Sequence, residues 1–310
     1  MAINLTTYYY SPLRYPGGKV KLANYFQLLF QYNLLSGGHY VEPYAGGASV
    51  ALSLLFNEFA SVIHINDFDF RIYCFWDAVL NNTEEFCILI EETPVTMETW
   101  NAQREIRRNP EDYSKLEIAF STFFLNRTNR SGILKAGVIG GQNQNGKWKI
   151  DARYNIEELI SRIKKISRYR ERINLYNEDA PVLVNRLAGE LPENTLFYFD
   201  PPYYNKGRDL YINYYKHDDH VEVSRIVSSI KDQHWVVSYD NQENIKELYE
   251  GYLQQTYSLN YHAGNAAKGS EVIIFSNNLI VPKVENPADR EQIKRFSREG
   301  LFAEWIDKRR

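Results

Sequence analysis

The stretch from Tyr40 to Asp67 constrains the fold more than any other part of the chain. It reads Tyr-Val-Glu-Pro, then Tyr-Ala-Gly-Gly-Ala-Ser, then an apolar run that ends at Phe56, which is the pattern of a strand, a glycine turn and a helix. A second apolar run over 61–65 ends in Asn66-Asp67, so an acidic residue follows the glycine pair by about 20 positions. This spacing predicts a nucleotide-binding β-α-β unit and a parallel, Rossmann-like sheet.

Short apolar runs later in the chain predict the rest of that sheet. They cover 173–176, 196–199, 235–239 and 271–275. The run over 196–199 ends directly before Asp200, and the run over 235–239 ends directly before Asp240. Two further acids are therefore expected where strands end. The expected fold class is therefore α/β, with a mostly parallel sheet.

The region between the two groups of strands has a different character. Helical periodicity and polar loops dominate it, and Asn155 with Glu158 three residues later is the start signal of a helix. We predict an inserted, mainly helical domain over 71–172, flanked by sheet-forming parts 1–70 and 173–285, with a C-terminal helical tail over 286–310.

Charge is distributed unevenly along the chain. The whole protein has 36 Lys and Arg against 39 Asp and Glu, a net charge of −3, but residues 103–172 carry 16 basic against 8 acidic residues. Within this region the segment 126–150 has no acid at all and holds Arg127, Arg130, Lys135, Lys147 and Lys149. Such a segment favours contact with an anionic partner over an ordinary solvated surface.

The tetrapeptide Asp200-Pro-Pro-Tyr203 carries the most chemical information. It follows a buried strand, where open α/β sheets bind ligands, and the two prolines fix the backbone so that the Pro201 carbonyl and the Asp200 carboxylate offer two acceptors side by side. An exocyclic amino group that donates both hydrogens there becomes nucleophilic at nitrogen, and Tyr203 offers a face for stacking. The alternative is a strand-ending turn with no further role.

Together these motifs resemble a Dam-type DNA adenine-N6 methyltransferase. The resemblance spans residues 11 to 204 in the family's order, through Leu13-Arg-Tyr-Pro-Gly-Gly-Lys19, Val41–Ser49, Asn66-Asp67, Phe124–Gly132 and Asp200–Tyr203. It implies a seven-stranded methyltransferase sheet in which 71–172 recognises the target and the flanking parts bind S-adenosylmethionine. The implied reaction moves a methyl group to N6 of an adenine that is flipped out of double-stranded DNA.

The resemblance also assigns residues to the site. It implies catalytic roles for Asp200, Pro201, Pro202 and Tyr203, and cofactor contacts for Tyr15, Lys19, Pro43, Gly46, Gly47, Asp67, Asp179 and Asp200. Glycines let the backbone approach a ligand closely, and Asp67 can accept hydrogen bonds from ribose hydroxyls. Lys19 has several open readings, which are the methionine carboxylate, a DNA phosphate or an exposed surface charge.

Contacts with DNA are expected from the basic segment. Arg127, Asn129 and Arg130 suit bidentate contact with bases or phosphates, and Lys135 and Lys147 suit phosphates. The segment departs from the familiar pattern of the family, so the recognised DNA sequence does not follow from it.

Other functions remain as alternatives at this point. Cytosine-N4, RNA adenine or a glutamine amide would need the same paired acceptors, and a non-catalytic DNA-binding specificity module could keep the same fold. An aspartate at the head of the motif and the basic insertion favour adenine in DNA, and the intact tetrapeptide speaks against the module. A cognate restriction endonuclease that acts separately is a candidate partner.

The remaining features are less informative. His217 and His220 lack a third ligand cluster, so no metal site is expected, and Cys74 and Cys87 are expected to be buried thiols. The chain shows neither a secretory signal nor an apolar run long enough for a membrane span, which favours a cytoplasmic protein, bacterial or phage-encoded and associated with DNA.

Overall fold

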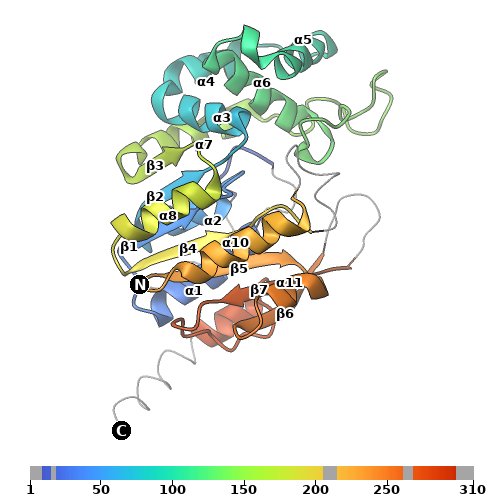
Figure 1. Cartoon of the computed structure of the whole chain (residues 1–310). Coiled ribbons are helices and arrows are strands. Elements are labelled where there is room, and N and C mark those ends of the chain that lie inside the picture. The colour runs from blue at the N-terminus through green and yellow to red at the C-terminus, as the bar shows by residue number, and fades with distance from the viewer. Residues whose placement is uncertain (1–8, 15–18, 205–214, 261–267, 298–310) are drawn as a thin grey trace.

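The computed structural model describes residues 9–14, 19–204, 215–260 and 268–297 (Figure 1). Within these ranges, no helix is both long and apolar enough to cross a membrane. The two cysteines are buried and form no disulfide, as expected.

A seven-stranded sheet in the order β3-β2-β1-β4-β5-β7-β6 organises the chain. Neighbouring strands from β3 to β5 are parallel, and β7 runs antiparallel to both β5 and β6. The strands are β1 (Gly38–Glu42), β2 (Ala60–Asn66), β3 (Ile173–Tyr176), β4 (Thr195–Phe199), β5 (His234–Asp240), β6 (Leu253–Asn260) and β7 (Lys268–Phe275). The predicted methyltransferase-like α/β fold is therefore confirmed.

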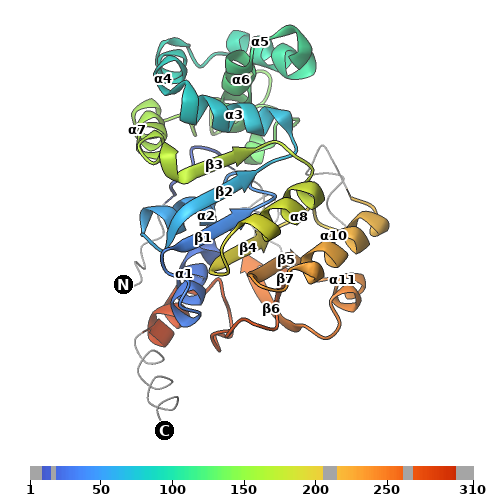
Figure 2. The same ribbon diagram turned by 60° about the vertical axis from the view of Figure 1, so that its left-hand side comes forward.

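Helices cover both faces of the sheet, as Figure 2 shows. One face packs on α1 (Ala23–Tyr32) and α2 (Ser49–Phe56), and the other on α8 (Ala180–Glu190), α10 (His217–Ser229) and α11 (Glu243–Leu248). Strand β4 shows why its sequence is apolar throughout. Leu196 and Tyr198 join the first core, whereas Phe197 and Phe199 join the second, as expected of a strand buried on both faces.

Five helices between β2 and β3 form the insertion. They are α3 (Phe70–Asn81), α4 (Thr83–Glu92), α5 (Met97–Arg108), α6 (Lys115–Thr128) and α7 (Ile156–Ser167). The central helix α6 starts with a capping box between Ser114 and Glu117, and nearly all of its later residues are buried. Asn155 caps α7 through the backbone N–H of Glu158, as predicted.

The insertion does not have a core of its own. Phe75 and Phe123 of its helices belong to the same apolar cluster as Tyr40 and Ile63 of the sheet.

Short 3-10 turns connect the elements; they are η1 (Val20–Leu22), η2 (Pro110–Asp112), η3 (Arg130–Gly132) and η4 (Arg170–Arg172). The chain continues past β7 into a helical stretch over 290–297, in which Ile293 is fully buried. The division into domains stays a prediction.

Candidate active site

The carboxyl ends of β1, β2, β3, β4 and β5 carry the candidate site. Strands β1 and β4 are neighbours, and the chain leaves β1 toward β2 but leaves β4 toward β5, so the two connections diverge at the carboxyl ends of this pair of strands. Ligands of open α/β sheets bind at this kind of topological switch point. The acids that the sequence predicts at strand ends, Asp67, Asp200 and Asp240, lie at this same edge of the sheet.

Asn66, the last residue of β2, ties three of these strand ends together. Its Nδ2 donates to the carbonyls of Pro43 (2.9 Å) and Glu178 (3.0 Å), and its Oδ1 accepts from the N–H of Glu178 (2.9 Å). The side chain is 1% exposed. The loops after β1, β2 and β3 are thus held by one buried amide whose donors and acceptor are all used.

The glycine loop and Asp67 form a single unit. Gly46 has φ +47°, a conformation that glycine adopts readily, and its N–H donates to Asp67 Oδ2 at 2.9 Å. Its carbonyl accepts from the indole N–H of Trp76 in α3 (2.9 Å), and Gly47 lies buried beside it. The other oxygen, Asp67 Oδ1, accepts from the N–H of Asp69 (2.9 Å). Each oxygen retains capacity to accept from a ligand hydroxyl.

Burial, together with the nearby charge of Asp69, raises the pKa of Asp67 to about 7. Asp179 lies at the start of α8, where its side chain is exposed and makes no capping bond. Phe68, next to Asp67, is 60% exposed. This part of the edge therefore presents a carboxylate, a glycine backbone and an open aromatic face.

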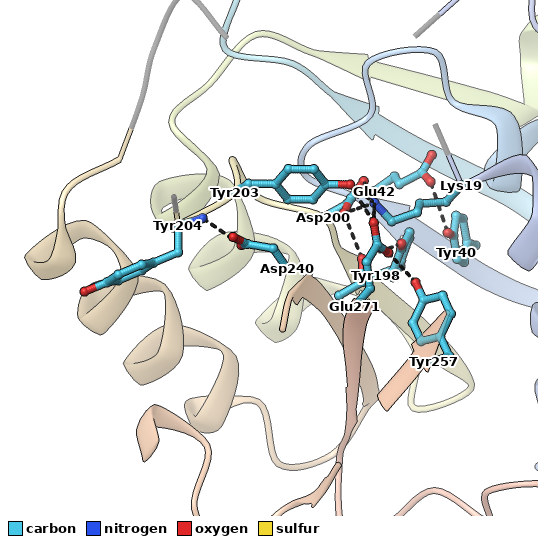
Figure 3. Close-up of polar contacts among 11 residues, drawn as sticks. Lys19, Tyr40, Glu42, Tyr198, Asp200, Tyr203, Tyr204, Asp240, Tyr257 and Glu271 are labelled. Carbon is cyan, nitrogen blue, oxygen red and sulfur yellow. Dashed lines mark hydrogen bonds and ion pairs between the residues drawn. The ribbon is translucent and has the colours of Figure 1, made fainter. Parts of the chain in front are cut away.

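A second cluster surrounds Asp200 (Figure 3). Lys19 Nζ lies 2.8 Å from Asp200 Oδ1 and 3.1 Å from Oδ2, and Ser238 Oγ donates to Oδ1 at 2.8 Å. Tyr198 in turn contacts Ser238 Oγ at 2.7 Å. The Lys19 side chain is only 4% exposed, whereas that of Asp200 is 20% exposed and remains reachable.

These contacts leave one oxygen of Asp200 able to accept another hydrogen bond. A carboxylate oxygen accepts about two hydrogen bonds, and Oδ1 already receives Lys19 and Ser238. Among the residues that the structure describes, Oδ2 receives only Lys19. The geometry thus keeps one acceptor position of Oδ2 for a donor from outside the protein.

Tyr203 and Glu271 complete this cluster. Lys19 Nζ donates to Tyr203 Oη (3.2 Å), and Tyr203 Oη donates to Glu271 Oε1 (2.6 Å). Tyr257 donates to the other Glu271 oxygen at 2.5 Å. The Tyr203 ring is 3% exposed, so the face expected to stack on a base is covered in this conformation.

The electrostatics of the cluster keep Lys19 charged. Burial lowers the pKa of Lys19, but the carboxylates of Asp200 and Glu271 outweigh it and hold that pKa well above its ordinary value. Burial raises the pKa of Asp200, against the opposing effect of Lys19. Glu42, at the end of β1, is fully buried and its pKa rises to about 8, so it is mostly protonated at neutral pH.

Asp240 supports the strand end from the other side. Its Oδ1 accepts from the backbone N–H of Tyr204 (2.8 Å), directly after the Asp-Pro-Pro-Tyr motif. Asp240 and Glu271 lie opposite each other in the β5–β7 ladder. The antiparallel end of the sheet therefore holds the motif at Tyr203 and Tyr204.

Residues 15–263 match the family of D12 class N6 adenine-specific DNA methyltransferases. The chain belongs to this family. It is an S-adenosylmethionine-dependent methyltransferase that acts on N6 of adenine in DNA.

Other known proteins show lower similarity to this chain. The methyltransferase is 23% identical to the type II methyltransferase M.MjaIII of Methanocaldococcus jannaschii, over 77% of this chain and 88% of that protein. Among solved structures, it is similar to the rRNA methyltransferase aviRa of Streptomyces viridochromogenes (12% identity, 83% of this chain and 84% of that chain, TM-score 0.33). It is also similar to a SAM-dependent methyltransferase of Agrobacterium tumefaciens (9% identity, 83% and 61%, TM-score 0.36).

Asn129 of the methyltransferase lies in the interior, which does not fit the predicted base contact. The residue is fully buried, its Oδ1 accepts from the indole of Trp100 (2.7 Å), and its Nδ2 donates to the carbonyls of Ile133 and Leu134 (both 3.1 Å). The whole amide is used to shape the loop that follows α6, so none of it faces a base.

Arg127 is also partly committed within the protein. Its Nε donates to the Arg153 carbonyl (2.7 Å) and its Nη1 to the Pro12 carbonyl (3.4 Å), and burial lowers its pKa to about 10. In contrast, Arg130, Lys135 and Lys147 are exposed. The loop that carries Lys147 extends beyond the helices of the insertion in Figure 1.

Some contributors to the site were missed by sequence reasoning. Ser238 and Glu271 lie in predicted strands, but only the folded sheet brings them to Asp200 and Tyr203. Tyr257, which supports Glu271 from outside the site, lies in a strand that was not predicted. Tyr15 lies outside the described residues. His220 is buried against Tyr239, and the described residues contain no cluster of three potential metal ligands.

Proposed function

We propose that this enzyme is a site-specific methyltransferase that acts on an adenine flipped out of double-stranded DNA and bound at Asp200. The observation that carries the proposal is the remaining acceptor position on Asp200 Oδ2, beside the fixed backbone of Pro201 and Pro202. The target amino group would donate one hydrogen to this oxygen and the other to the Pro201 carbonyl. Both bonds draw the nitrogen lone pair out of conjugation with the ring.

The glycine loop and Asp67 fit S-adenosylmethionine. The cofactor carries no phosphate, and the edge offers carboxylates and a glycine loop rather than a basic phosphate cradle. In our proposal Asp67 accepts from the ribose hydroxyls, the backbone of Pro43, Gly46 and Gly47 lies against the ligand, and Asp179 faces the adenine.

Bound there, the cofactor supplies a methyl group on a positively charged sulfur. The amino nitrogen would accept that methyl group with its lone pair, and the electron pair of the C–S bond would stay on sulfur. The nitrogen then releases one proton to water. Asp200 stabilises the positive charge that develops on nitrogen, and Lys19 and Ser238 hold the carboxylate in place.

DNA contact is proposed for the exposed residues Arg130, Lys135 and Lys147 of the basic segment. Arg127 uses Nε and Nη1 for contacts within the protein, and in our proposal the rest of its guanidinium contacts DNA from the partly buried face of α6. Phosphate contacts position a protein on DNA, whereas base contacts specify the site. Tyr203 would stack on the base only after its ring is uncovered.

The alternative of a non-catalytic specificity module is not favoured, because the acceptors, Lys19 and the glycine loop are all in place. We further propose that the enzyme is bacterial or phage-encoded, acts in the cytoplasm and is accompanied by a separate restriction endonuclease. The likeness to a type II methyltransferase supports the last point.

Sequencing of DNA from cells that express the protein tests this function. The genome of a host without endogenous adenine methylation should acquire N6-methyladenine at one short sequence motif. Cells that express Asp200→Ala at the same level provide the control and should show none. Methylation spread without a motif, or equal methylation by Asp200→Ala, would refute the proposal.

A further inference from the structure

Glu271 is the least explained charged residue near the site. It lies in β7, beyond the family-matched residues 15–263, and it is fully buried. Both of its oxygens accept from tyrosine hydroxyls, at 2.6 Å from Tyr203 and 2.5 Å from Tyr257, and Lys19 Nζ lies 3.7 Å away. Tyr203 also accepts from Lys19, so its own hydrogen points to Glu271. These contacts match an ionised carboxylate.

Counting charges shows what this carboxylate adds. Lys19 contributes one positive charge and Asp200 one negative charge, and the two cancel at 2.8 Å. Glu42 adds little because its pKa of about 8 keeps it mostly protonated. Asp240 accepts from the Tyr204 N–H. Among the described residues that contact Lys19, Glu271 is the one that makes the cluster negative.

We propose that Glu271 is a positioning residue that acts through Lys19: it offsets the lysine charge, so that Asp200 presents net negative charge to the target nitrogen. This proposal rests on the proposed role of Asp200. The target nitrogen becomes positive as it bonds the methyl carbon, and a buried negative charge stabilises that change more than water would. A purely structural Glu271 would only hold Tyr203 and Tyr257 in place.

Two substitutions separate charge from hydrogen bonding. Glu271→Gln keeps the size but removes the charge and one of the two acceptors, because an amide nitrogen cannot accept from a tyrosine hydroxyl. Glu271→Asp keeps the charge but withdraws the carboxylate from the tyrosines. Tyr257→Phe is the matched control, because it removes one hydrogen bond to Glu271 and no charge. Single-turnover methylation at saturating DNA and cofactor gives the rate for each variant.

We expect Glu271→Gln to lower this rate at least about tenfold, and Glu271→Asp and Tyr257→Phe to stay within about threefold of the wild type. Affinities for S-adenosylhomocysteine and for DNA should stay unchanged in all three. The opposite order, with Glu271→Asp slow and Glu271→Gln normal, would overturn the proposal. If Glu271→Gln does not fold, Glu271→Asp replaces it in the test, and a rate at least about tenfold below the wild type with the charge retained would overturn the proposal.

The pH profile gives an independent readout. Burial raises the pKa of Asp200 and Lys19 lowers it, while Glu271 adds to the rise and Ser238 to the lowering. Removing the Glu271 charge should therefore move the acidic limb of the rate profile to lower pH, and Tyr257→Phe should leave it in place. An active wild type and inactive Asp200→Ala, combined with an unaltered Glu271→Gln, would overturn this proposal and leave the proposed function intact.

Discussion

Asn126 in α6 ties the insertion to the segment that leads to Lys19. Its Oδ1 accepts from the N–H of Arg14 (2.7 Å), and its Nδ2 donates to the carbonyls of Arg14 (2.8 Å) and Gly132 (2.9 Å). The side chain is 1% exposed. Gly132 packs so closely on Arg14 that an added Cβ would lie 2.2 Å from the Arg14 carbonyl oxygen.

Asn126→Ala should therefore cost about 3 kcal/mol in the free energy of unfolding. The substitution removes three hydrogen bonds, each with a net contribution of about 1 kcal/mol, and it leaves their backbone partners in a place that water reaches poorly. A buried backbone group that finds no new partner costs about 1–3 kcal/mol, so the total loss is larger where such groups stay unsatisfied.

Asn33 provides a matched control with the same chemistry. Its Oδ1 accepts from the N–H of Ile280 (2.7 Å), and its Nδ2 donates to the carbonyls of Ile280 (3.0 Å) and Leu29 (2.9 Å). This residue is only half-buried, so water can replace the lost bonds and Asn33→Ala should cost about 1 kcal/mol. Urea unfolding of both variants, followed by circular dichroism, gives the comparison. Equal losses would refute the reasoning from burial.

Three further predictions concern titration and DNA binding. Calorimetry should show that S-adenosylhomocysteine binding weakens below about pH 7, because Asp67 becomes protonated there. Asp67→Asn should lack this pH dependence. An affinity of the wild type that does not change with pH would contradict the role of Asp67 in cofactor binding. The folded-state pKa of Glu42 lies above its ordinary 4.5, so the wild type should lose stability as pH rises from 4.5 toward 8. Glu42→Gln should lack this loss in urea unfolding at several pH values, and parallel curves would contradict it. Lys135→Ala should lower the salt slope of DNA binding by about 1 in fluorescence anisotropy. Lys231→Ala, an exposed lysine after α10, should not change that slope, and equal slopes for both variants would argue against the assigned DNA contact.

Strands β1, β2, β4 and β5 could be predicted because they are mostly buried and end in an acid or directly before one. Strand β6 was missed because it is an edge strand that pairs only with β7, and its sequence Leu-Gln-Gln-Thr-Tyr-Ser-Leu-Asn is largely polar. Its Tyr257 nevertheless reaches Glu271. The contribution of an edge strand to a site depends on its register, which a polar sequence specifies weakly.

Roles inside the basic segment could not be assigned from residue type. Asn129 has the donors and acceptor that suit a base edge, but they suit backbone groups equally well, and the structure uses them on Trp100, Ile133 and Leu134. The contact between Glu271 and Tyr203 could not be predicted for another reason, because the two residues lie 68 positions apart along the chain. Contacts across such distances follow from the topology of the sheet.

Single-turnover methylation by the wild type and Asp200→Ala tests the central claim most directly. A duplex that contains the recognised site is mixed with excess enzyme and methyl-labelled cofactor, and N6-methyladenine is quantified after digestion. We expect the wild type to form N6-methyladenine and Asp200→Ala to be slower by about 100-fold or more, with unchanged affinity for S-adenosylhomocysteine and DNA. A variant that methylates adenine at a near wild-type rate would contradict the assignment of Asp200 as the group that activates the amino nitrogen.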